Sequence, residues 1–156
     1  EQRCRVVEEL LASAPVGLRV AFADQGVIAG DVFRTGRPAR LPVAEAARRL
    51  GVSYERLLEH VDAIVALAYL RSRDDVAAHL AVYVDAVGAA RTAAVLRPTP
   101  PDTGDPAGLV AKAVTVAGLG LRDLYFYNHA FAREADLEAL AAAVGTVRAG
   151  ERGDRP

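Results

Sequence analysis

The segment from residue 42 to residue 70 constrains the fold of this chain more than any other part of it. Its first half carries small and apolar residues at helical spacing and ends at Gly51, a residue free to adopt the positive φ common at helix ends. Ser53 follows, at the position where a side-chain oxygen caps a second helix. After it, helical spacing recurs at Leu57, Val61, Ile64, Val65 and Ala68. The segment therefore predicts two helices joined by a tight turn, the helix-turn-helix arrangement.

Composition limits the classes of protein to which the chain can belong. With 156 residues, of which 52% are hydrophobic, it can bury one sizeable core, with room for a small second subdomain. The formal net charge of −1 excludes a chain that binds polyanions over its whole surface, and it leaves nucleic-acid contact to a local patch. Of the 19 basic residues only Lys112 is a lysine, a bias that we attribute to genome composition rather than to chemistry.

Few residue patterns indicate enzyme chemistry. The single cysteine, Cys4, excludes a disulfide within the chain and favours a cytoplasmic location. The apolar runs stop well short of the roughly 20 residues that span a bilayer, so a membrane protein is not expected. No phosphate-binding glycine motif, nucleophile elbow or complete set of metal ligands occurs, so we expect neither an enzyme nor a cofactor. For Asp75 and His79, four residues apart, we expect a surface ion pair rather than a metal site.

Before the central segment, the residue pattern predicts a short helix over residues 3–14 and a hairpin over residues 17–33. A polar loop follows that is rich in arginine. Together with Arg48 and Arg49 it makes the most basic stretch of the chain. The arginines of this loop are Arg34, Arg37 and Arg40.

Residues 63–87 fit two different structures. Apolar residues alternate strictly from residue 76 to residue 84, which favours a strand that forms a hairpin with the end of the preceding segment. Leu80, Val84 and Val87 also share one face of a helix, so the same residues fit a helix as well. Periodicity alone leaves both alternatives open.

Four prolines between residues 98 and 106 predict a linker. Residues 1–97 would then form one domain, and residues 107–156 a C-terminal helical segment. The last helix carries an apolar stripe of Leu137, Leu140, Ala141, Val144 and Val147. Because an apolar stripe must be covered, we expect the helix to pair with its symmetry mate in a homodimer, with packing inside one chain as the alternative.

Three short stretches carry a resemblance to known proteins: LGVS at residues 50–53, VALAYLR at residues 65–71 and RDD at residues 73–75. In these stretches the chain resembles winged helix-turn-helix transcription regulators of the IclR-like and MarR-like type. The resemblance implies an α+β, mainly helical fold, with a winged helix-turn-helix-like core and an accessory C-terminal helical segment. It also implies a regulator that binds duplex DNA. The DNA contacts would come from Ser53, Tyr54 and Arg56 in the major groove, Arg71 and Arg73 at the wing, and Arg34, Arg37 and Arg40 at phosphates.

A second resemblance implies a different function. The stretch VFRTGRPARLP at residues 32–42, followed by VALAYLRSRDDVAAHLAVYVD at residues 65–85, is similar to GAF domains, which sense small molecules. It implies a hairpin over residues 64–85 and a ligand-sensing or protein-interaction module without DNA contact. Glu55, Glu59 and Asp62 favour this alternative, because they would repel phosphates. The ligand pocket of such a module would be lined by Tyr83, Tyr125, Phe126, Tyr127 and His129.

Overall fold

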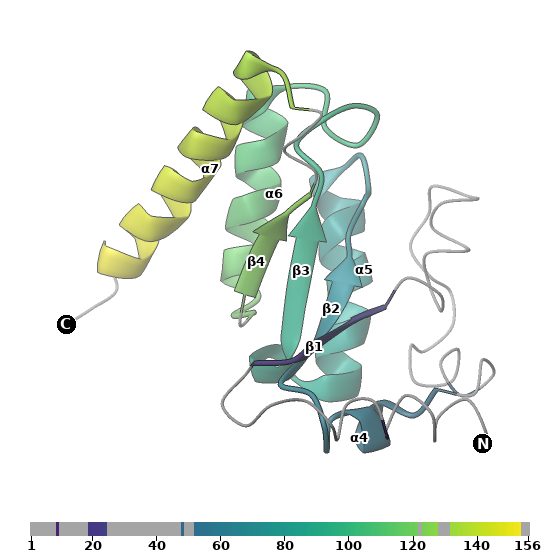
Figure 1. Cartoon of the computed structure of the whole chain (residues 1–156). Coiled ribbons are helices and arrows are strands. Elements are labelled where there is room, and N and C mark those ends of the chain that lie inside the picture. Colours follow the sequence, from purple (N-terminus) through teal and green to yellow (C-terminus); the bar gives the residue numbers. More distant parts are fainter. Residues whose placement is uncertain are drawn as a thin grey trace.

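The computed structural model describes residues 9, 19–24, 48, 52–121, 123–127 and 132–153. Within these ranges the chain forms a parallel sheet and the helices that connect its strands (Figure 1). The strands are β1 Ala21–Asp24, β2 Ala63–Leu67, β3 Thr92–Leu96 and β4 Asp123–Phe126. The helices are α4 Tyr54–Leu57, α5 Arg73–Val87, α6 Pro106–Gly118 and α7 Glu134–Gly153, with a 3₁₀ turn η1 at Ala89–Arg91.

The strands pair in their sequence order, β1-β2-β3-β4, and every pair is parallel. Because parallel neighbours need a crossover connection, the chain passes through α5 between β2 and β3 and through α6 between β3 and β4. Right-handed crossovers between sequential strands place their helices on one face. Figure 1 shows α5 and α6 behind the sheet, with α7 beside α6. The carboxyl ends of all four strands therefore lie at the same edge of the sheet.

Local sequence signals set the bounds of the two crossover helices. Ser72 caps α5, because its Oγ accepts a 3.0 Å hydrogen bond from the backbone N–H of Asp75. Asp105 caps α6 in the same way, with Oδ1 2.7 Å from the N–H of Gly108. Gly88 ends α5 at a φ of 82°, a backbone conformation that residues with a Cβ rarely adopt.

The main core lies between the sheet and the helices. Alternate residues of β2 and β3 point into it, among them Ile64 and Leu96, and Leu80 of α5 and Leu109 of α6 cover them. All four side chains are at most 1% exposed. Complete burial of a side chain of this size contributes about 1.5–3 kcal/mol, so this layer is the principal source of stability.

Helix α7 packs on α6 within the chain. Ala139 and Ala143 are buried in the main core, and Leu140 and Val147 pack against it. Leu137, at 45% exposed, is the large apolar residue of the predicted stripe that remains open to solvent. The intrachain alternative therefore accounts for part of the stripe, and the homodimer stays a prediction.

The opposite face of the sheet is concave and lined by small residues. Val65, Ala93 and Val95 are buried on it. Arg19, just before β1, forms a 2.6 Å ion pair with Asp123 at the start of β4, which lies at the other edge of the sheet. Since neighbouring strands lie about 4.8 Å apart, an arginine can reach across two intervening strands only if the sheet is strongly curled. In Figure 1, β1 accordingly runs obliquely across the lower ends of β2 and β3.

The structure corrects the second half of the helix-turn-helix prediction. The Oγ of Ser53 does accept a hydrogen bond from the N–H of Arg56, but the helix that it caps, α4, ends at Leu57 after 4 residues. Residues 63–67 form strand β2 instead, because a continuous apolar run suits a strand covered on both faces as well as it suits a helix. The mixture of helices and strands is confirmed, whereas a parallel sheet fits a winged helix poorly.

Residues 63–87 confirm the helical alternative from Arg73 to Val87, where α5 forms, and they form no hairpin. They form β2 and then α5, so the hairpin over residues 64–85 implied by the GAF resemblance is wrong. The buried side chains of α5 are Val76, His79, Leu80 and Tyr83. Their spacing of three, four and seven residues is that of one helical face.

The proline-rich segment is the loop between β3 and α6. Strand β4, which comes after it, pairs with β3 in the same sheet, and residues of α6 and α7 share one core with residues of α5. The predicted division into residues 1–97 and residues 107–156 is therefore not a division of this fold. Apart from β1 and single positions, the segments predicted as helix over 3–14, hairpin over 17–33 and first helix before Gly51 lie outside the described residues.

Candidate binding site at the carboxyl ends of the strands

Three side chains stand in a row just beyond the last paired residues of β2, β3 and β4. Leu67 pairs with Val95, and Val95 pairs with Tyr125. Because successive side chains of a strand alternate between faces, the residues two positions further on share the concave face. Backbone hydrogen bonds of 2.9 Å continue the pairing beyond the strands. This carboxyl-end row consists of Tyr69, Arg97 and Tyr127.

Tyr69 contacts both of the other side chains of the carboxyl-end row. The rings of Tyr69 and Tyr127 are stacked, with centroids 6.1 Å apart and planes 21° apart. The guanidinium carbon of Arg97 lies 4.4 Å from the centroid of the Tyr69 ring, a cation–π contact. Tyr127 remains 52% exposed, so the row presents an aromatic surface to solvent.

The loop after β3 adds a carboxylate to the row. Oδ2 of Asp102 lies 3.0 Å from Nη1 of Arg97, and Asp102 is 9% exposed. Thr103 closes the loop, because its Oγ1 donates a 2.7 Å hydrogen bond to the carbonyl oxygen of Arg97. Its backbone N–H also donates a 3.3 Å bond to Thr99. The loop therefore returns to the end of the strand from which it starts.

Lys112, on α6, holds this loop from below. It is 3% exposed, and its Nζ donates to the backbone carbonyl of Asp102 and, at 3.4 Å, to Oγ1 of Thr103. Burial lowers the pKa of Lys112, and the charges of Asp102 and Asp105 oppose this shift. A buried ammonium group is costly unless it is hydrogen-bonded, so the loop and the lysine stabilise each other.

The electrostatics of the site are balanced. Arg97 and Asp102 form an ion pair, and burial raises the pKa of Tyr69, with the nearby Arg97 opposing this. Tyr69 is therefore a neutral hydroxyl at pH 7. Aromatic rings, a guanidinium and a carboxylate can together stack on a ligand, donate hydrogen bonds to it and accept them from it.

No family model, curated protein or solved structure matches this chain. The assignment of a site consequently rests on topology and side-chain geometry. In open α/β sheets, ligands bind outside the carboxyl ends of the parallel strands, in a crevice where the strand order reverses; the described strands show no reversal, so the rule indicates only this end of the sheet. The carboxyl-end row and Asp102 occupy that place in this sheet.

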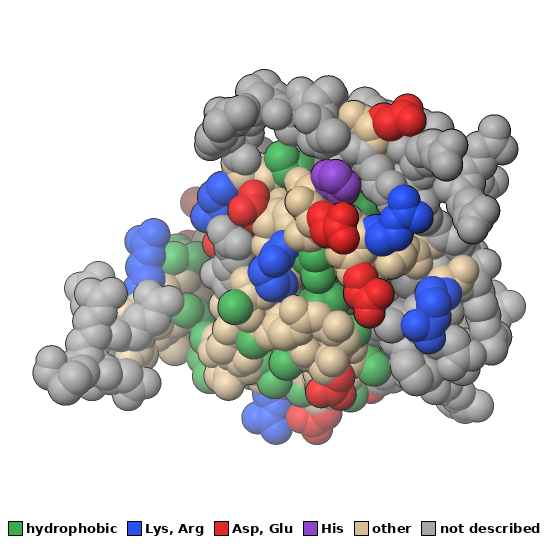
Figure 2. Space-filling view, turned by 90° about the horizontal axis from the view of Figure 1, so that it is seen from below, with side chains coloured by type: hydrophobic (Ala, Val, Ile, Leu, Met, Phe, Trp, Pro, Cys, Tyr) green, Lys and Arg blue, Asp and Glu red, His purple; other side chains and the backbone are tan. Residues whose placement is uncertain are grey.

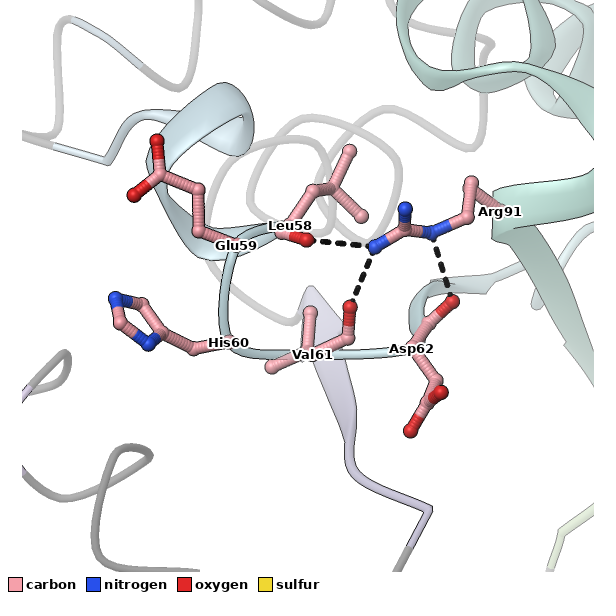
Figure 3. A pocket seen from close by; sticks show the side chains of 6 residues that line it. All are labelled: Leu58, Glu59, His60, Val61, Asp62 and Arg91. Atoms are coloured by element: carbon pink, nitrogen blue, oxygen red, sulfur yellow. Dashed lines mark hydrogen bonds between the residues drawn. The ribbon is translucent and has the colours of Figure 1, made fainter.

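A pocket of about 370 Å³ lies at the opposite end of the sheet, where the strands begin (Figure 3). Its lining consists of Leu58, Glu59, His60, Val61, Asp62 and Arg91. The guanidinium of Arg91 donates three hydrogen bonds to backbone carbonyl groups of the chain. Nε donates to the carbonyl of Asp62 at 3.0 Å, and Nη2 donates to the carbonyls of Leu58 and Val61 at 2.7 and 2.6 Å. In Figure 3 the side chains of Glu59 and His60 point away from this guanidinium. Arg91 therefore fixes the turn between α4 and β2 to the start of β3.

We expect the Arg91→Met variant to lower the free energy of unfolding by about 2 kcal/mol, because three half-buried carbonyl groups lose a charged donor. Arg91→Lys is the matched control, and it should restore less than half of the loss, since a single ammonium cannot reproduce the planar fork. Urea unfolding followed by circular dichroism measures both variants. Equal stability of the methionine and wild-type chains would show that the turn does not depend on Arg91.

The residues predicted to contact DNA do not form one surface within the described chain. Tyr54 is buried, and its hydroxyl donates to Asp24, so it cannot reach a DNA groove; this prediction is wrong. Arg56, Arg71 and Arg73 are exposed. Figure 2, a view of the end where the strands begin, shows acidic and basic side chains intermingled on this face, without a patch of one sign among its described residues. Ser53 is the cap of α4, and Arg34, Arg37 and Arg40 lie outside the described residues.

The residues predicted to line a ligand pocket divide between the two faces of the sheet. Tyr83, on α5, is buried in the main core, and Phe126 packs against that core. Tyr125 and Tyr127 lie on the concave face at 44% and 52% exposed, and His129 is outside the described residues. The single pocket predicted from them is therefore not formed, and of this set only Tyr127 belongs to the carboxyl-end row. Sequence reasoning missed Tyr69, Arg97, Asp102 and Lys112.

No group of three or more His, Cys, Asp and Glu side chains in the described ranges could hold a metal ion. None of the described helices is both long enough and apolar enough to cross a membrane.

Proposed function

We propose that this chain binds a small polar molecule at the carboxyl ends of its strands. The contact surface is the carboxyl-end row together with Asp102. The observation that supports the proposal is the convergence of Tyr69, Arg97 and Tyr127 from three neighbouring strands onto one another, beside a carboxylate that a separate loop supplies. Side chains that are only structural have no need to gather where the edge of a sheet is open to solvent.

The construction of the loop supports the same conclusion. Lys112 is buried at 3% exposed and holds the backbone of Asp102, although the loop itself lies at the surface. A fixed loop loses little conformational entropy when a ligand binds, which raises affinity. Supporting contacts of this kind are what a binding site needs if its side chains are to keep their geometry.

Binding of duplex DNA stays a prediction that the geometry does not support. It depends on a recognition helix, and α4 has 4 residues, with Tyr54 turned inward. The cytoplasmic location and the homodimer likewise stay predictions. Ligand sensing without DNA contact, the alternative drawn from the acidic residues near Glu59, agrees better with the carboxyl-end row.

The Tyr127→Ala variant tests the proposal directly. A fragment library screened by amide chemical shifts should give ligands that move the signals of Tyr69, Arg97 and Tyr127. We expect Tyr127→Ala to weaken their binding at least tenfold, about 1.4 kcal/mol, because half of the aromatic surface is lost.

Tyr125→Ala is the matched control for Tyr127→Ala. Tyr125 lies two residues earlier on the same face and has a similar exposure of 44%, but it precedes the row. We expect the affinities of the Tyr125→Ala variant for the same ligands to stay within about twofold of the wild-type affinities, a change well under 1 kcal/mol. Ligands that move only signals around the pocket at Arg91, or that bind Tyr127→Ala as tightly as wild type, would refute the proposal.

A further inference from the structure

We infer that the ligand of this site is an uncharged, polyhydroxylated ring, that is, a sugar or a sugar-like molecule, which lies on the Tyr127 ring and bonds to Arg97 and Asp102. The inference rests on the proposed function and adds the chemical class of the ligand. Three observations carry it: the charge balance of the site, the free hydrogen-bonding capacity of its polar pair, and the support behind its exposed ring.

The charge balance excludes a strongly anionic or cationic ligand. Nη1 of Arg97 lies 3.0 Å from Oδ2 of Asp102, and the two side chains are only 25% and 11% exposed. An anion that approached Arg97 would meet the Asp102 carboxylate beside it, and a cation that approached Asp102 would meet the guanidinium. Lys112, the next positive charge of the site, is buried and bonded to the loop. A neutral ligand avoids both repulsions.

The polar pair has hydrogen-bonding capacity left over. Within the part of the chain that the structure describes, Oδ2 of Asp102 accepts no hydrogen bond of normal geometry, although it lies 3.0 Å from Nη1 of Arg97. Arg97 has five N–H donors, and Asp102 is its only ion-pair partner in these ranges. Donors and acceptors thus lie side by side. A hydroxyl group both donates and accepts, so neighbouring hydroxyls on a ring can satisfy the two side chains together, whereas a carboxylate or phosphate can only accept.

The exposed ring of Tyr127 provides a supported platform. It is 52% exposed, and Tyr69 stacks on it at a centroid distance of 6.1 Å while Arg97 contacts Tyr69 at 4.4 Å. The platform is therefore ordered before any ligand binds, which avoids an entropic cost on binding. The C–H groups on one face of a sugar ring are apolar and pack on an aromatic ring, while its hydroxyls project from the edge toward polar partners. This division of apolar face and polar edge matches Tyr127 and the Arg97–Asp102 pair.

The test compares three classes of probe by amide chemical shifts and calorimetry on the full chain. The neutral probes are the methyl glycosides of glucose, galactose and mannose; the anions are inorganic phosphate and glucuronate; the planar apolar probe is indole. We expect at least one methyl glycoside to bind and to move the signals of Arg97 and Tyr127. We also expect Tyr127→Ala and Asp102→Asn each to weaken the binding of this glycoside at least tenfold. The affinity of Tyr125→Ala for it should stay within twofold of the wild-type value.

The remaining outcomes separate the ligand class from the proposed function. Tighter binding of phosphate or glucuronate than of every glycoside, or binding of indole alone, at the carboxyl-end row would overturn the inference of an uncharged, polyhydroxylated ligand and leave the proposed function standing. Failure of all three classes and of the fragment library to move the row's signals would overturn both. Melting temperatures of the variants show whether each is folded. Tyr127→Phe, which keeps the aromatic ring and removes the hydroxyl, provides a second test of stacking at this position. If Tyr127→Phe loses as much glycoside affinity as Tyr127→Ala, the stacking argument is wrong.

Discussion

Replacing Asp24 by alanine should lower the free energy of unfolding by about 4 kcal/mol, because two buried hydroxyl groups lose their acceptor. Asp24 ends β1 and is 2% exposed. Its Oδ2 accepts hydrogen bonds from the hydroxyls of Tyr54 and, at 3.0 Å, Tyr83. The three side chains tie β1, α4 and α5 together, so the loss should appear as reduced stability of the whole fold.

Both tyrosines are held in the protonated form that this network needs. Burial first, and then the charge of Asp24, raises the pKa of Tyr54 and of Tyr83 above the ordinary value for tyrosine. Each hydroxyl therefore keeps its proton and donates a hydrogen bond to the carboxylate. The rings also lie close, with centroids 6.5 Å apart, so the polar network is enclosed by aromatic surface.

A double-mutant cycle in urea distinguishes the network from simple packing. Tyr83→Phe should cost about 2 kcal/mol by itself, and in the Asp24→Ala background it should cost at least 1 kcal/mol less, because its partner is already gone. Asp74→Ala is the matched control, since the Asp74 side chain is 85% exposed and pairs with its exposed neighbour Arg73. Additive losses for Asp24 and Tyr83 would mean that the hydroxyl bond contributes nothing.

The sequence predicted local features of the fold and failed on the long-range ones. Ser53 was identified as a helix cap because capping depends on a few neighbouring residues. Leu80 was recognised as part of the helical face of α5. Alanines occupy many other positions of this helix, and alanine fits the exposed face of a helix and the face of a strand alike, so the choice between helix and strand stayed open. The register of four parallel strands is set by contacts between residues far apart in sequence, and no local pattern encodes it.

The candidate site was hidden for the same reason. Tyr69 and Arg97 lie just past two apolar runs, and their proximity follows only once both runs are known to be parallel neighbours. Lys112 did carry a signal, as the single lysine of an arginine-rich chain, but we attributed it to composition. Its buried contact with the carbonyl of Asp102 gives a physical reason for lysine, because an ammonium is more compact than a guanidinium and needs fewer acceptors.

His79 was expected at the surface beside Asp75, and the structure places it in the core. It is 1% exposed, its ring centroid lies 5.3 Å from that of Tyr83, and neither ring nitrogen makes a hydrogen bond of normal geometry to a described residue. Asp75 instead accepts a 2.6 Å bond from the hydroxyl of Ser72 at the start of α5. Burial lowers the pKa of His79 to about 4, against smaller opposing effects of the Leu67 carbonyl and the Asp24 carboxylate. The ring is therefore neutral at pH 7.

Stability should consequently fall as the pH is lowered from 6.5 to about 4. In this window the unfolded chain binds a proton at His79 that the folded chain does not bind, since the ordinary pKa is 6.5 and the folded value is about 4. The free energy of unfolding should decrease by about 3 kcal/mol across the window and then level off with respect to this group. Asp136 titrates lower, because a hydrogen bond from Arg133 lowers its pKa to about 2.

Urea unfolding at a series of pH values measures this loss, and His79→Leu should remove most of it. Leucine fills the buried position without a titrating group, so the variant should also keep near-wild-type stability at pH 7, because the imidazole makes no hydrogen bond of normal geometry with the described residues. His60→Gln, at a half-buried histidine in the turn after α4, is the matched histidine replacement. If His79→Leu loses stability between pH 6.5 and 4 as steeply as wild type does, another group is responsible, and His79 is not held neutral by burial.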